Sequence, residues 1–444
     1  MKSLSRRDMI RLAVALPTAG LFTRFRALAA SAVNRVKITG IRAMAIQNIA
    51  GNCLVRIDTD SGLTGYGEAG ATGPMARARI ATMRNLLIGK DPLTIEVHFH
   101  NMTSLMHTYM AHIPTISGID MALWDLAGKI LGAPVSTLLG GPFRESIPMY
   151  SHGLNLNMLD KSSCRDWAQR IKEMPEGFTA FKNGIDPVLG VPSARFAPTL
   201  TTQQLRNVAH AYANCREAVG DDIDIAVHCH NELDTPSAIA VAKAVEPMNP
   251  LFIEDALNPP FSEAWMALRR STRVPLLTGE KLEMVRGFKP FVDNQAVDII
   301  HPDLAFAGGF TGTRKIADYA YQFRTPVALH NVGSLVLTYA NAQFGSSIEN
   351  FYRSESQLGR PNHYIEAMAA GSPPEVRKGL LKVPTAPGLG VKLDRDKMME
   401  YSELYKRLGN YPYDQDPGRP GWSPLVPNDR WADPAEARAV KIPF

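Results

Sequence analysis

Between about residues 147 and 355 the chain alternates between short apolar runs, each ending in a polar residue, and longer stretches of helical periodicity. The runs are IPMYSH, FTAFK, DIAVHCH, PLFIED, VPLLTGE, VDIIHPD, TPVALH and SSIEN. Short buried strands that alternate with helices are typical of parallel α/β folds, and eight of them predict a (β/α) barrel.

The spacing of the polar residues supports the barrel more firmly than the composition of the runs. Six polar residues, each at or just beyond the end of its run, follow one another at steps of 23 to 27 positions, which is the length of one strand, one helix and two loops: His228, Glu254, Glu280, Asp303, His330 and Glu355. In a barrel all these strand ends surround one mouth, where the active sites of this fold lie.

A different pattern precedes the barrel. Residues 33–69 read as an antiparallel meander (RVKITGIRAMAI, NCLVRIDT, then LTGYGEA), and GIDMALWDLAGKILG follows as a helix with one buried face. We predict an α+β capping domain over residues 31–141, the barrel over 142–380, and a C-terminal segment, 381–444, that returns to the cap.

Residues 1–30 predict an export signal. They contain an arginine pair, a short apolar stretch and an Ala-Leu-Ala site, as in leaders of the twin-arginine route. The expected location is therefore periplasmic. The alternative is an amphipathic helix of the fold, because Arg24 and Arg26 interrupt the apolar stretch.

The composition of the chain limits the classes of partner that we expect it to bind. The chain has 444 residues, of which 45% are hydrophobic and 20% charged, and its formal net charge is +5. Without a Lys/Arg run we expect no nucleic-acid partner, and without an apolar run of about 18 residues no membrane contact after signal removal. The mild basicity suits a small anionic substrate. Four scattered cysteines do not make a disulfide framework.

Three strand-end residues predict a metal site. His228, Glu254 and Glu280 would place one nitrogen and two carboxylates around a common point, and buried carboxylates on adjacent strands repel each other unless a cation lies between them. Strand alternation would also put the imidazole of His230 on the same face as that of His228.

A proton-transfer group is predicted on another side of the mouth. Asp303 beside His330 would fix the tautomer of the imidazole and stabilise its charged form. Lys182, at the end of the second run, is a further basic candidate.

Taken together, these motifs resemble the enolase superfamily, in its mandelate racemase-like branch, and most closely its acid-sugar dehydratases. The resemblance covers roughly residues 33–392. It rests on GLTGYGEA, IDMALWDLAGKILGAPVSTLLGG, FIED, TGE, HPDLAFAGG and APGLGV in the same order and spacing.

The resemblance implies a modified TIM barrel, (β/α)7β, under an N-terminal α+β cap, an Mg²⁺ ion, and a reaction that begins by removing the proton next to a carboxylate. By the same resemblance Glu254 and Glu280 match metal ligands, and His330 with Asp303 matches a catalytic dyad. His230 matches a second acid/base histidine and Lys182 a basic residue of the second strand. Glu355 matches an acid that contacts the substrate.

His228 departs from this pattern, which has an aspartate there. An imidazole lowers the ligand charge and offers nitrogen where Mg²⁺ prefers oxygen. Three readings stay open: a site for Mn²⁺, Zn²⁺ or Fe²⁺, a weakened Mg²⁺ site, or a lost metal site. His152 and Arg195 are further substrate-binding candidates, each with a structural alternative.

The function expected from this resemblance is a metal-dependent carbon–oxygen lyase that dehydrates an aldonate- or uronate-type acid sugar to a 2-keto-3-deoxy acid. The alternatives are a racemase, epimerase or cycloisomerase of the same superfamily, and a non-catalytic periplasmic binding protein. A homo-oligomer is expected by analogy.

Overall fold

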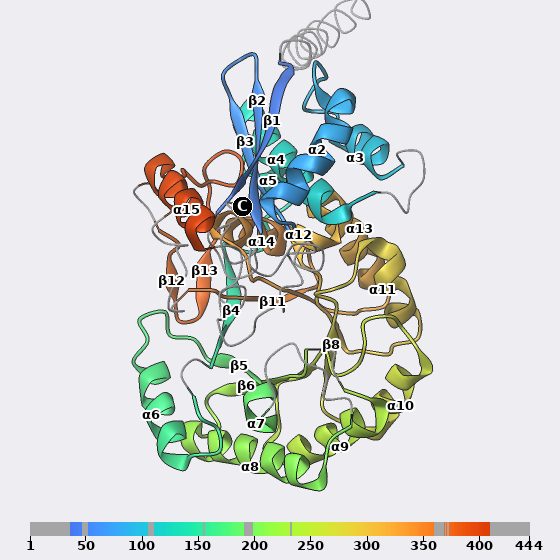
Figure 1. Cartoon of the computed structure of the whole chain (residues 1–444), viewed down its shortest axis with the longest axis vertical. Helices are drawn as coiled ribbons and strands as arrows, with labels where there is room; N and C mark the ends of the chain where they lie inside the picture. The colour runs from blue at the N-terminus through green and yellow to red at the C-terminus, as the bar shows by residue number, and fades with distance from the viewer. Residues whose placement is uncertain are drawn as a thin grey trace, which may run out of the picture.

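The computed structural model describes residues 36–46, 52–104, 111–153, 156–190, 199–230, 233–358, 368, 370 and 373–408. The predicted signal, residues 1–30, lies outside these ranges, as does Arg195. Figure 1 shows a small sheet with its helices above a barrel ringed by helices. No helix among the described residues is long and apolar enough to cross a membrane.

The cap is built on the predicted meander. Strands β1 (Ile38–Ala45), β2 (Cys53–Thr59) and β3 (Thr64–Ala69) pair antiparallel in the order β1-β2-β3. Helices α2 (Gly73–Leu87), α3 (Ile95–Thr103), α4 (Ile113–Leu131) and α5 (Val135–Leu138) follow them. The predicted α+β cap is confirmed.

The glycines of the TGYGEA motif allow β3 and α4 to touch through their backbones. A Cβ atom at Gly65 would lie 2.1 Å from the carbonyl oxygen of Ala122, and one at Gly67 would lie 2.1 Å from that of Gly118. No side chain fits at such distances, so this motif holds the strand directly on the helix.

Eight parallel strands form a closed barrel. They run in sequence order from β4 to β11, and β11 pairs with β4. Their bounds are β4 (Ser146–His152), β5 (Ala180–Gly184), β6 (Asp224–His228), β7 (Ile253–Glu254), β8 (Leu276–Thr278), β9 (Ile299–Ile300), β10 (Val327–Leu329) and β11 (Phe351–Glu355). The predicted (β/α)7β barrel is confirmed.

Helices connect these strands, and the longer ones cover the outside of the barrel (Figure 1). The connecting helices are α6 (Lys161–Lys172), α7 (Asp186–Leu189), α8 (Thr202–Val219), α9 (Thr235–Val245), α10 (Glu263–Ser271), α11 (Met284–Asp293), α12 (Leu304–Ala307), α13 (Gly309–Gln322) and α14 (Leu335–Ser347), with a 3-10 turn, η2 (Glu246–Met248). Inside the barrel, seven successive strands each contribute one residue, within the strand or just before it, to a buried layer: Tyr150, Ala180, Ala226, Phe252, Leu277, Ile299 and Ala328. The interior is therefore filled, and only the mouth is left for chemistry.

One predicted strand was wrong in position. The run SSIEN begins with Ser346 and Ser347, which end α14, and the strand that closes the barrel starts at Phe351. All residues of α14 are buried, so its sequence resembles that of a buried strand. Only its greater length distinguishes such a helix from a strand in the sequence.

The chain after the barrel returns toward the cap. Strands β12 (Val376–Arg377) and β13 (Leu380–Lys382) form a hairpin that pairs antiparallel with β4. The N–H of Leu389 then donates to Asp125 on α4 at 2.8 Å, and helix α15 (Arg395–Leu408) contacts β1.

Candidate metal centre and active site

The strand ends bring the three predicted metal ligands together. Ligand atoms of His228, Glu254 and Glu280, with Asp255 as a fourth residue, all lie within 4.8 Å of one another. His228 ends β6 and Glu254 ends β7, while Glu280 follows β8. This cluster is called the His228 cluster below.

A glycine allows the third strand end to reach the cluster. Gly279, just before Glu280, has φ 144°, and a Cβ atom there would lie 2.9 Å from the backbone nitrogen of His301. A side chain at this position would push β8 away from the neighbouring strand end, so the Thr-Gly-Glu sequence is needed for local geometry as well as for its carboxylate.

The free atoms of the His228 cluster suit a cation. His228 Nε2, Glu254 Oε2 and Asp255 Oδ2 are buried and have no hydrogen-bond partner among the described residues. Buried polar atoms are normally satisfied, and one imidazole with several carboxylates is a donor set for a divalent metal. The residues present therefore fit a divalent metal ion.

Electrostatics support the same conclusion. Burial raises the pKa of Glu254 to about 8, against the opposing ammonium of Lys182. For Glu280 burial acts in the same direction, but His330 and Lys182 outweigh it and lower the pKa to about 2. Lys182 therefore does not offset the burial of Glu254 in full, and a cation would provide further positive charge.

Lys182 lies between two acids inside the mouth. Its Nζ donates to Glu254 Oε1 at 2.7 Å and lies 3.1 Å from Glu355 Oε1. Burial by itself would lower the pKa of Lys182, but Glu254 and Glu355 outweigh it and raise the pKa above its ordinary value. Lys182 is therefore a buried cation at neutral pH.

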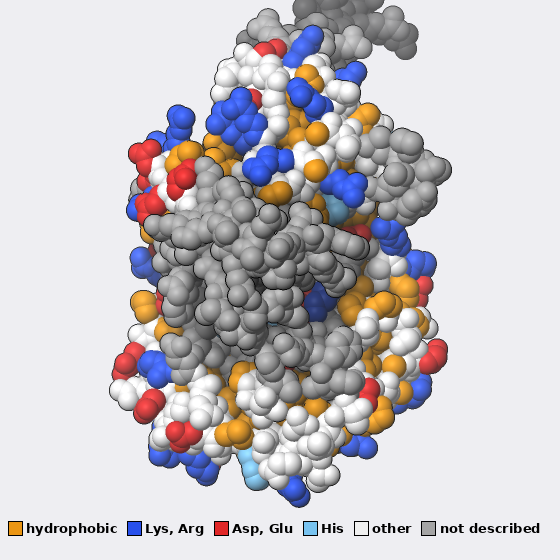
Figure 2. Space-filling view, viewed as in Figure 1, with side chains coloured by type: hydrophobic (Ala, Val, Ile, Leu, Met, Phe, Trp, Pro, Cys, Tyr) orange, Lys and Arg blue, Asp and Glu red, His pale blue; other side chains and the backbone are white. Residues whose placement is uncertain are grey.

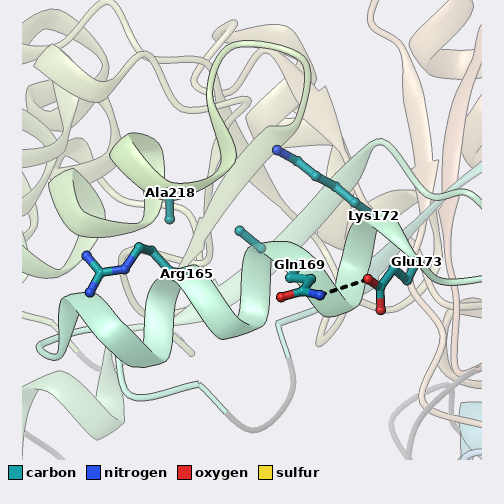
Figure 3. Close-up of a pocket in the computed structure, with 6 residues that line it drawn as sticks. Arg165, Gln169, Lys172, Glu173 and Ala218 are labelled. Carbon is teal, nitrogen blue, oxygen red and sulfur yellow. Dashed lines mark hydrogen bonds between the residues drawn. The ribbon is translucent and has the colours of Figure 1, made fainter.

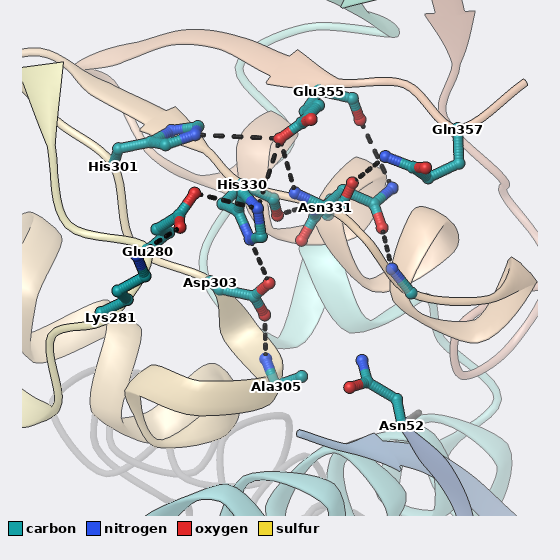
Figure 4. Close-up of polar contacts among 12 residues, drawn as sticks. Asn52, Glu280, Lys281, His301, Asp303, Ala305, His330, Asn331, Glu355 and Gln357 are labelled. Atoms are coloured by element: carbon teal, nitrogen blue, oxygen red, sulfur yellow. Dashed lines mark hydrogen bonds and ion pairs between the residues drawn. The ribbon is translucent and has the colours of Figure 1, made fainter. Parts of the chain in front are cut away.

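His330 and Asp303 form the predicted pair. His330 Nδ1 lies 2.6 Å from Asp303 Oδ2, and the N–H of Ala305 donates to the other oxygen of Asp303 at 2.6 Å. Figure 4 shows Glu280 and Glu355 near the imidazole; their closest oxygens are 3.3 Å and 3.6 Å from Nε2.

The charge state of His330 follows from these neighbours. Burial would lower its pKa, but Glu355, Glu280 and Asp303 outweigh burial and raise the pKa to about 10. The three neighbouring carboxylates therefore favour the protonated imidazole.

His230 has a carboxylate partner that the sequence did not reveal. Its Nδ1 lies 2.7 Å from Asp186 Oδ2, and its ring centroid is 3.7 Å from that of His228. The two imidazoles lie side by side as predicted, but strand alternation is not the reason. His230 lies beyond the end of β6 with φ 54°, and this left-handed turn places its ring against His228.

Glu355 is surrounded by donors at the end of β11. The imidazole of His152 contacts its Oε1, and the N–H of Asn331 donates to its Oε2 at 3.3 Å. The hydroxyl of Tyr150 also donates to Oε2, at 3.5 Å. Although burial acts in the opposite direction, Lys182 and His152 lower the pKa of Glu355 well below its ordinary value, so Glu355 is ionised.

His301 forms part of the floor of the mouth and was not identified from the sequence. Its Nε2 lies 3.2 Å from the Tyr150 hydroxyl and 3.7 Å from Glu254 Oε1. Burial, reinforced by His330, lowers the pKa of His301 well below its ordinary value, so this imidazole is neutral.

Sequence reasoning missed four residues of the mouth: Tyr150, Asp186, Asp255 and His301. Three of them lie within strand-like runs of the sequence: Tyr150 in IPMYSH, Asp255 at the end of PLFIED and His301 in VDIIHPD. Asp186 had a weaker signal, an Asp-Pro pair that starts the short helix α7.

A hollow on the outer surface of the barrel is less suitable as an active site than the mouth. A hollow between α6 and α8 is lined by Arg165, Ala168, Gln169, Lys172, Glu173 and Ala218 (Figure 3). It lies on the outside of the barrel, and its lining mixes both signs of charge. In the view of Figure 2, acidic and basic side chains are likewise interspersed over the described barrel helices.

Comparisons with known proteins agree with this architecture. Residues 33–140 match the mandelate racemase/muconate lactonizing enzyme N-terminal domain, and residues 165–397 match the enolase C-terminal domain-like family. A D-xylonate dehydratase of Haloferax volcanii is 32% identical over 82% of this chain and 88% of its own length. A D-gluconate dehydratase of Thermoproteus tenax is 31% identical over 78% of this chain and 69% of its own.

Solved structures show the same fold. A mandelate racemase/muconate lactonizing enzyme-like protein from Rubrobacter xylanophilus is similar with a TM-score of 0.74 at 30% identity, over 82% of this chain and 97% of that one. A mandelate racemase/muconate lactonizing enzyme from Sulfitobacter gives a TM-score of 0.75 at 25% identity, over 82% and 95%. With both domain families matched in order and the barrel closed as they require, the chain belongs to the enolase superfamily, in its mandelate racemase/muconate lactonizing enzyme branch.

Proposed function

We propose that this chain is a metal-dependent hydro-lyase that removes water from an acid sugar and releases a 2-keto-3-deoxy acid. One observation carries the proposal: two imidazoles, each paired with a carboxylate, stand at the ends of β6 and β10, four strands apart in a closed eight-stranded barrel. The curated relatives named as dehydratases support the reaction class.

Dehydration needs two proton transfers on one substrate. A base removes the proton from C2, next to the carboxylate, and an acid protonates the hydroxyl on C3 as its C–O bond breaks. The resulting enol takes up a proton at C3 to give the keto acid, so one water leaves for each substrate. His230 and His330 provide one imidazole on each side of the barrel axis for these two transfers.

The substrate carboxylate becomes more negative as the C2 proton leaves. A divalent cation held by His228, Glu254 and Glu280 would supply positive charge at that carboxylate. Lys182 adds a second, permanent charge, because Glu254 and Glu355 keep its ammonium in place.

This arrangement favours dehydration over two-base racemization. A second base opposite His330 would have to be Lys182, but this ammonium is buried between two carboxylates that raise its pKa. An amine held as a cation is a poor proton acceptor. Dehydration needs only one base, because the second group acts as an acid, and a protonated imidazole such as that of His330 suits the acid.

The test is a screen of acid sugars, including xylonate, gluconate and uronates, in D₂O with Mg²⁺, Mn²⁺ and Zn²⁺ supplied separately. We expect a 2-keto-3-deoxy product with deuterium at C3, observed by NMR. Deuterium at C2 of recovered substrate with no keto acid would instead establish an epimerase. Ligand binding with neither product nor exchange would point to a binding protein.

We further propose that the enzyme works in the periplasm as a homo-oligomer, on the basis of the arginine pair in residues 1–30 and of analogy. Cell fractionation of the full chain, with Arg6→Lys and Arg7→Lys introduced together as the export-defective control, tests the location. Light scattering on the mature protein tests the assembly.

A further inference from the structure

Asp255 lies at the metal site although strand geometry would direct it elsewhere. It follows Glu254 at the end of β7, and consecutive strand residues point to opposite faces. Its backbone, however, has φ 52°, a left-handed conformation that aspartate tolerates better than most residues. One of its carboxylate oxygens consequently lies within 4.8 Å of the ligand atoms of His228, Glu254 and Glu280.

The hydrogen bonds of the His228 cluster leave one atom free on each of three residues. Thr278 Oγ1 donates to Asp255 Oδ1 at 2.6 Å, and Lys182 occupies Glu254 Oε1. Asp255 Oδ2, Glu254 Oε2 and His228 Nε2 then have no hydrogen-bond partner among the described residues, although all three side chains are over nine-tenths buried. An uncompensated buried carboxylate is costly, and two of these three free atoms belong to carboxylates.

We propose that Asp255 is a fourth protein ligand of the divalent cation and compensates for the neutral imidazole of His228. With Asp255 the ligand set holds one nitrogen and three carboxylates, so the charge that His228 does not contribute comes from the adjacent strand end. A site of this kind favours Mn²⁺, Fe²⁺ or Zn²⁺ over Mg²⁺, which prefers oxygen ligands alone. The inference deepens the metal dependence of the proposed function.

Metal binding without substrate tests the assignment. Chelator-treated full chain is titrated with Mn²⁺, and free Mn²⁺ is followed by electron paramagnetic resonance. We expect Asp255→Asn, which keeps the acceptor for Thr278, to raise the Kd for Mn²⁺ at least tenfold. Affinity within twofold of the parent protein, or a parent protein that binds no Mn²⁺, overturns the proposal.

Two control variants separate coordination from charge and from local structure. Glu283→Gln removes a negative charge three residues beyond Glu280, and Thr278→Val removes the hydrogen bond to Asp255 but keeps the carboxylate. Both should stay within threefold of the parent Kd. If either weakens binding as much as Asp255→Asn does, Asp255 is not acting as a ligand.

Two further variants complete the test. In His228→Asp we expect the nitrogen coupling in the pulsed resonance spectrum of bound Mn²⁺ to disappear and the preference for Mn²⁺ over Mg²⁺ to fall at least fivefold; an unchanged preference contradicts the role of nitrogen. Should circular dichroism show Asp255→Asn unfolded, Asp255→Glu replaces it, with at least threefold weaker binding expected and unchanged binding contradictory. Because no substrate is present, a failed dehydration assay does not change these metal-binding results. Likewise, a binding result that contradicts the role of Asp255 does not by itself refute dehydration.

Discussion

Asp186 Oδ2 lies 2.7 Å from Nδ1 of His230, as Asp303 Oδ2 lies 2.6 Å from Nδ1 of His330. Asp186 is buried and is the first residue of the short helix α7, which begins two residues after β5 ends. The mouth therefore holds two aspartate–histidine pairs, built from different strands. Asp303 hydrogen-bonds Nδ1 of His330, whereas Asp186 contacts Nδ1 of His230 at ion-pair distance without an aligned hydrogen bond. In both pairs the aspartate lies at Nδ1, so Nε2 is the nitrogen available to a substrate.

Replacing Asp186 by Asn should impair turnover without removing the fold. The amide can turn its NH₂ group toward His230 and so stabilise the wrong tautomer. We expect kcat to fall about 10- to 1000-fold, since partners of catalytic histidines have effects of this range, with KM changed less than threefold. Steady-state kinetics measure both values. The exposed Asp166→Asn is the control, and an unchanged kcat in Asp186→Asn would refute a positioning role.

One of His230 and His330 should act as the base and the other as the acid. Without the base, both deuterium exchange at C2 and keto-acid formation should fall by about 10² or more. Without the acid, keto acid should fall by the same factor while exchange at C2 persists. NMR in D₂O on His230→Asn and His330→Asn measures both rates together. If neither variant slows product formation, these residues do not carry the chemistry.

A substrate analogue provides the control for that assignment. Fluoride at C3 leaves with little help from an acid, so a 3-deoxy-3-fluoro acid sugar should restore turnover only in the variant that lacks the acid. Rescue of both variants, or of neither, would contradict the division of roles.

Glu68 joins the cap to the helix that follows His330. Its Oε2 accepts from Ser334 N at 3.0 Å, Ser334 Oγ at 2.5 Å and Leu337 N at 3.2 Å, at the N-terminus of α14. Asn52 Nδ2 donates to the other oxygen, Oε1, at 3.1 Å. Glutamine has only one acceptor oxygen, so its NH₂ group would face a buried donor at one of the two positions. We expect Glu68→Gln to lower the free energy of unfolding by about 2 to 4 kcal/mol.

Urea unfolding of Glu68→Gln measures this loss. Glu96→Gln is the matched control, because Glu96 also links the cap to the barrel, through Lys315 at 2.7 Å, but on the exposed surface. Surface ion pairs contribute about 1 kcal/mol or less. Equal losses in the two variants would mean that burial of Glu68 does not matter.

Asp120 should make stability depend on pH. It is buried on α4, accepts from the N–H of Thr311 at 3.0 Å, and burial raises its pKa from 3.8 to about 7. The folded chain thus holds this proton more tightly than the unfolded chain, so stability conferred by the protonated form is lost as pH rises from about 4 to 7. Asp120→Asn removes the titration.

The free energy of unfolding of Asp120→Asn, minus that of the parent protein, should therefore increase from about pH 4 to pH 7, by at most roughly 1.4 kcal/mol per pH unit. Above pH 7 this difference should stay constant. Urea unfolding at pH 4.5, 6 and 8 measures the difference. The exposed Asp221→Asn should show no such trend. A difference that is constant with pH would contradict a raised pKa at Asp120.

The periodic features of the sequence predicted most of the fold. Residues such as His228, Glu254 and Glu280 could be assigned to one mouth because a strand-helix unit has a nearly fixed length. The eighth strand was misplaced, because a buried helix such as α14 has the same apolar composition as a strand. Asp255 was missed because its position depends on a left-handed backbone angle, which strand alternation does not predict.

The sequence by itself determined which chemical groups stand at the strand ends, since the length of each strand-helix unit is a local property of the chain. Only the tertiary structure decided which groups are partners. Lys182 on β5 meets Glu254 on β7 and Glu355 on β11, each two strands away around the barrel, and Asp186 after β5 meets His230 after β6. Closure of the barrel and the backbone angles at its rim set these distances, because they place residues far apart in the sequence within bonding range.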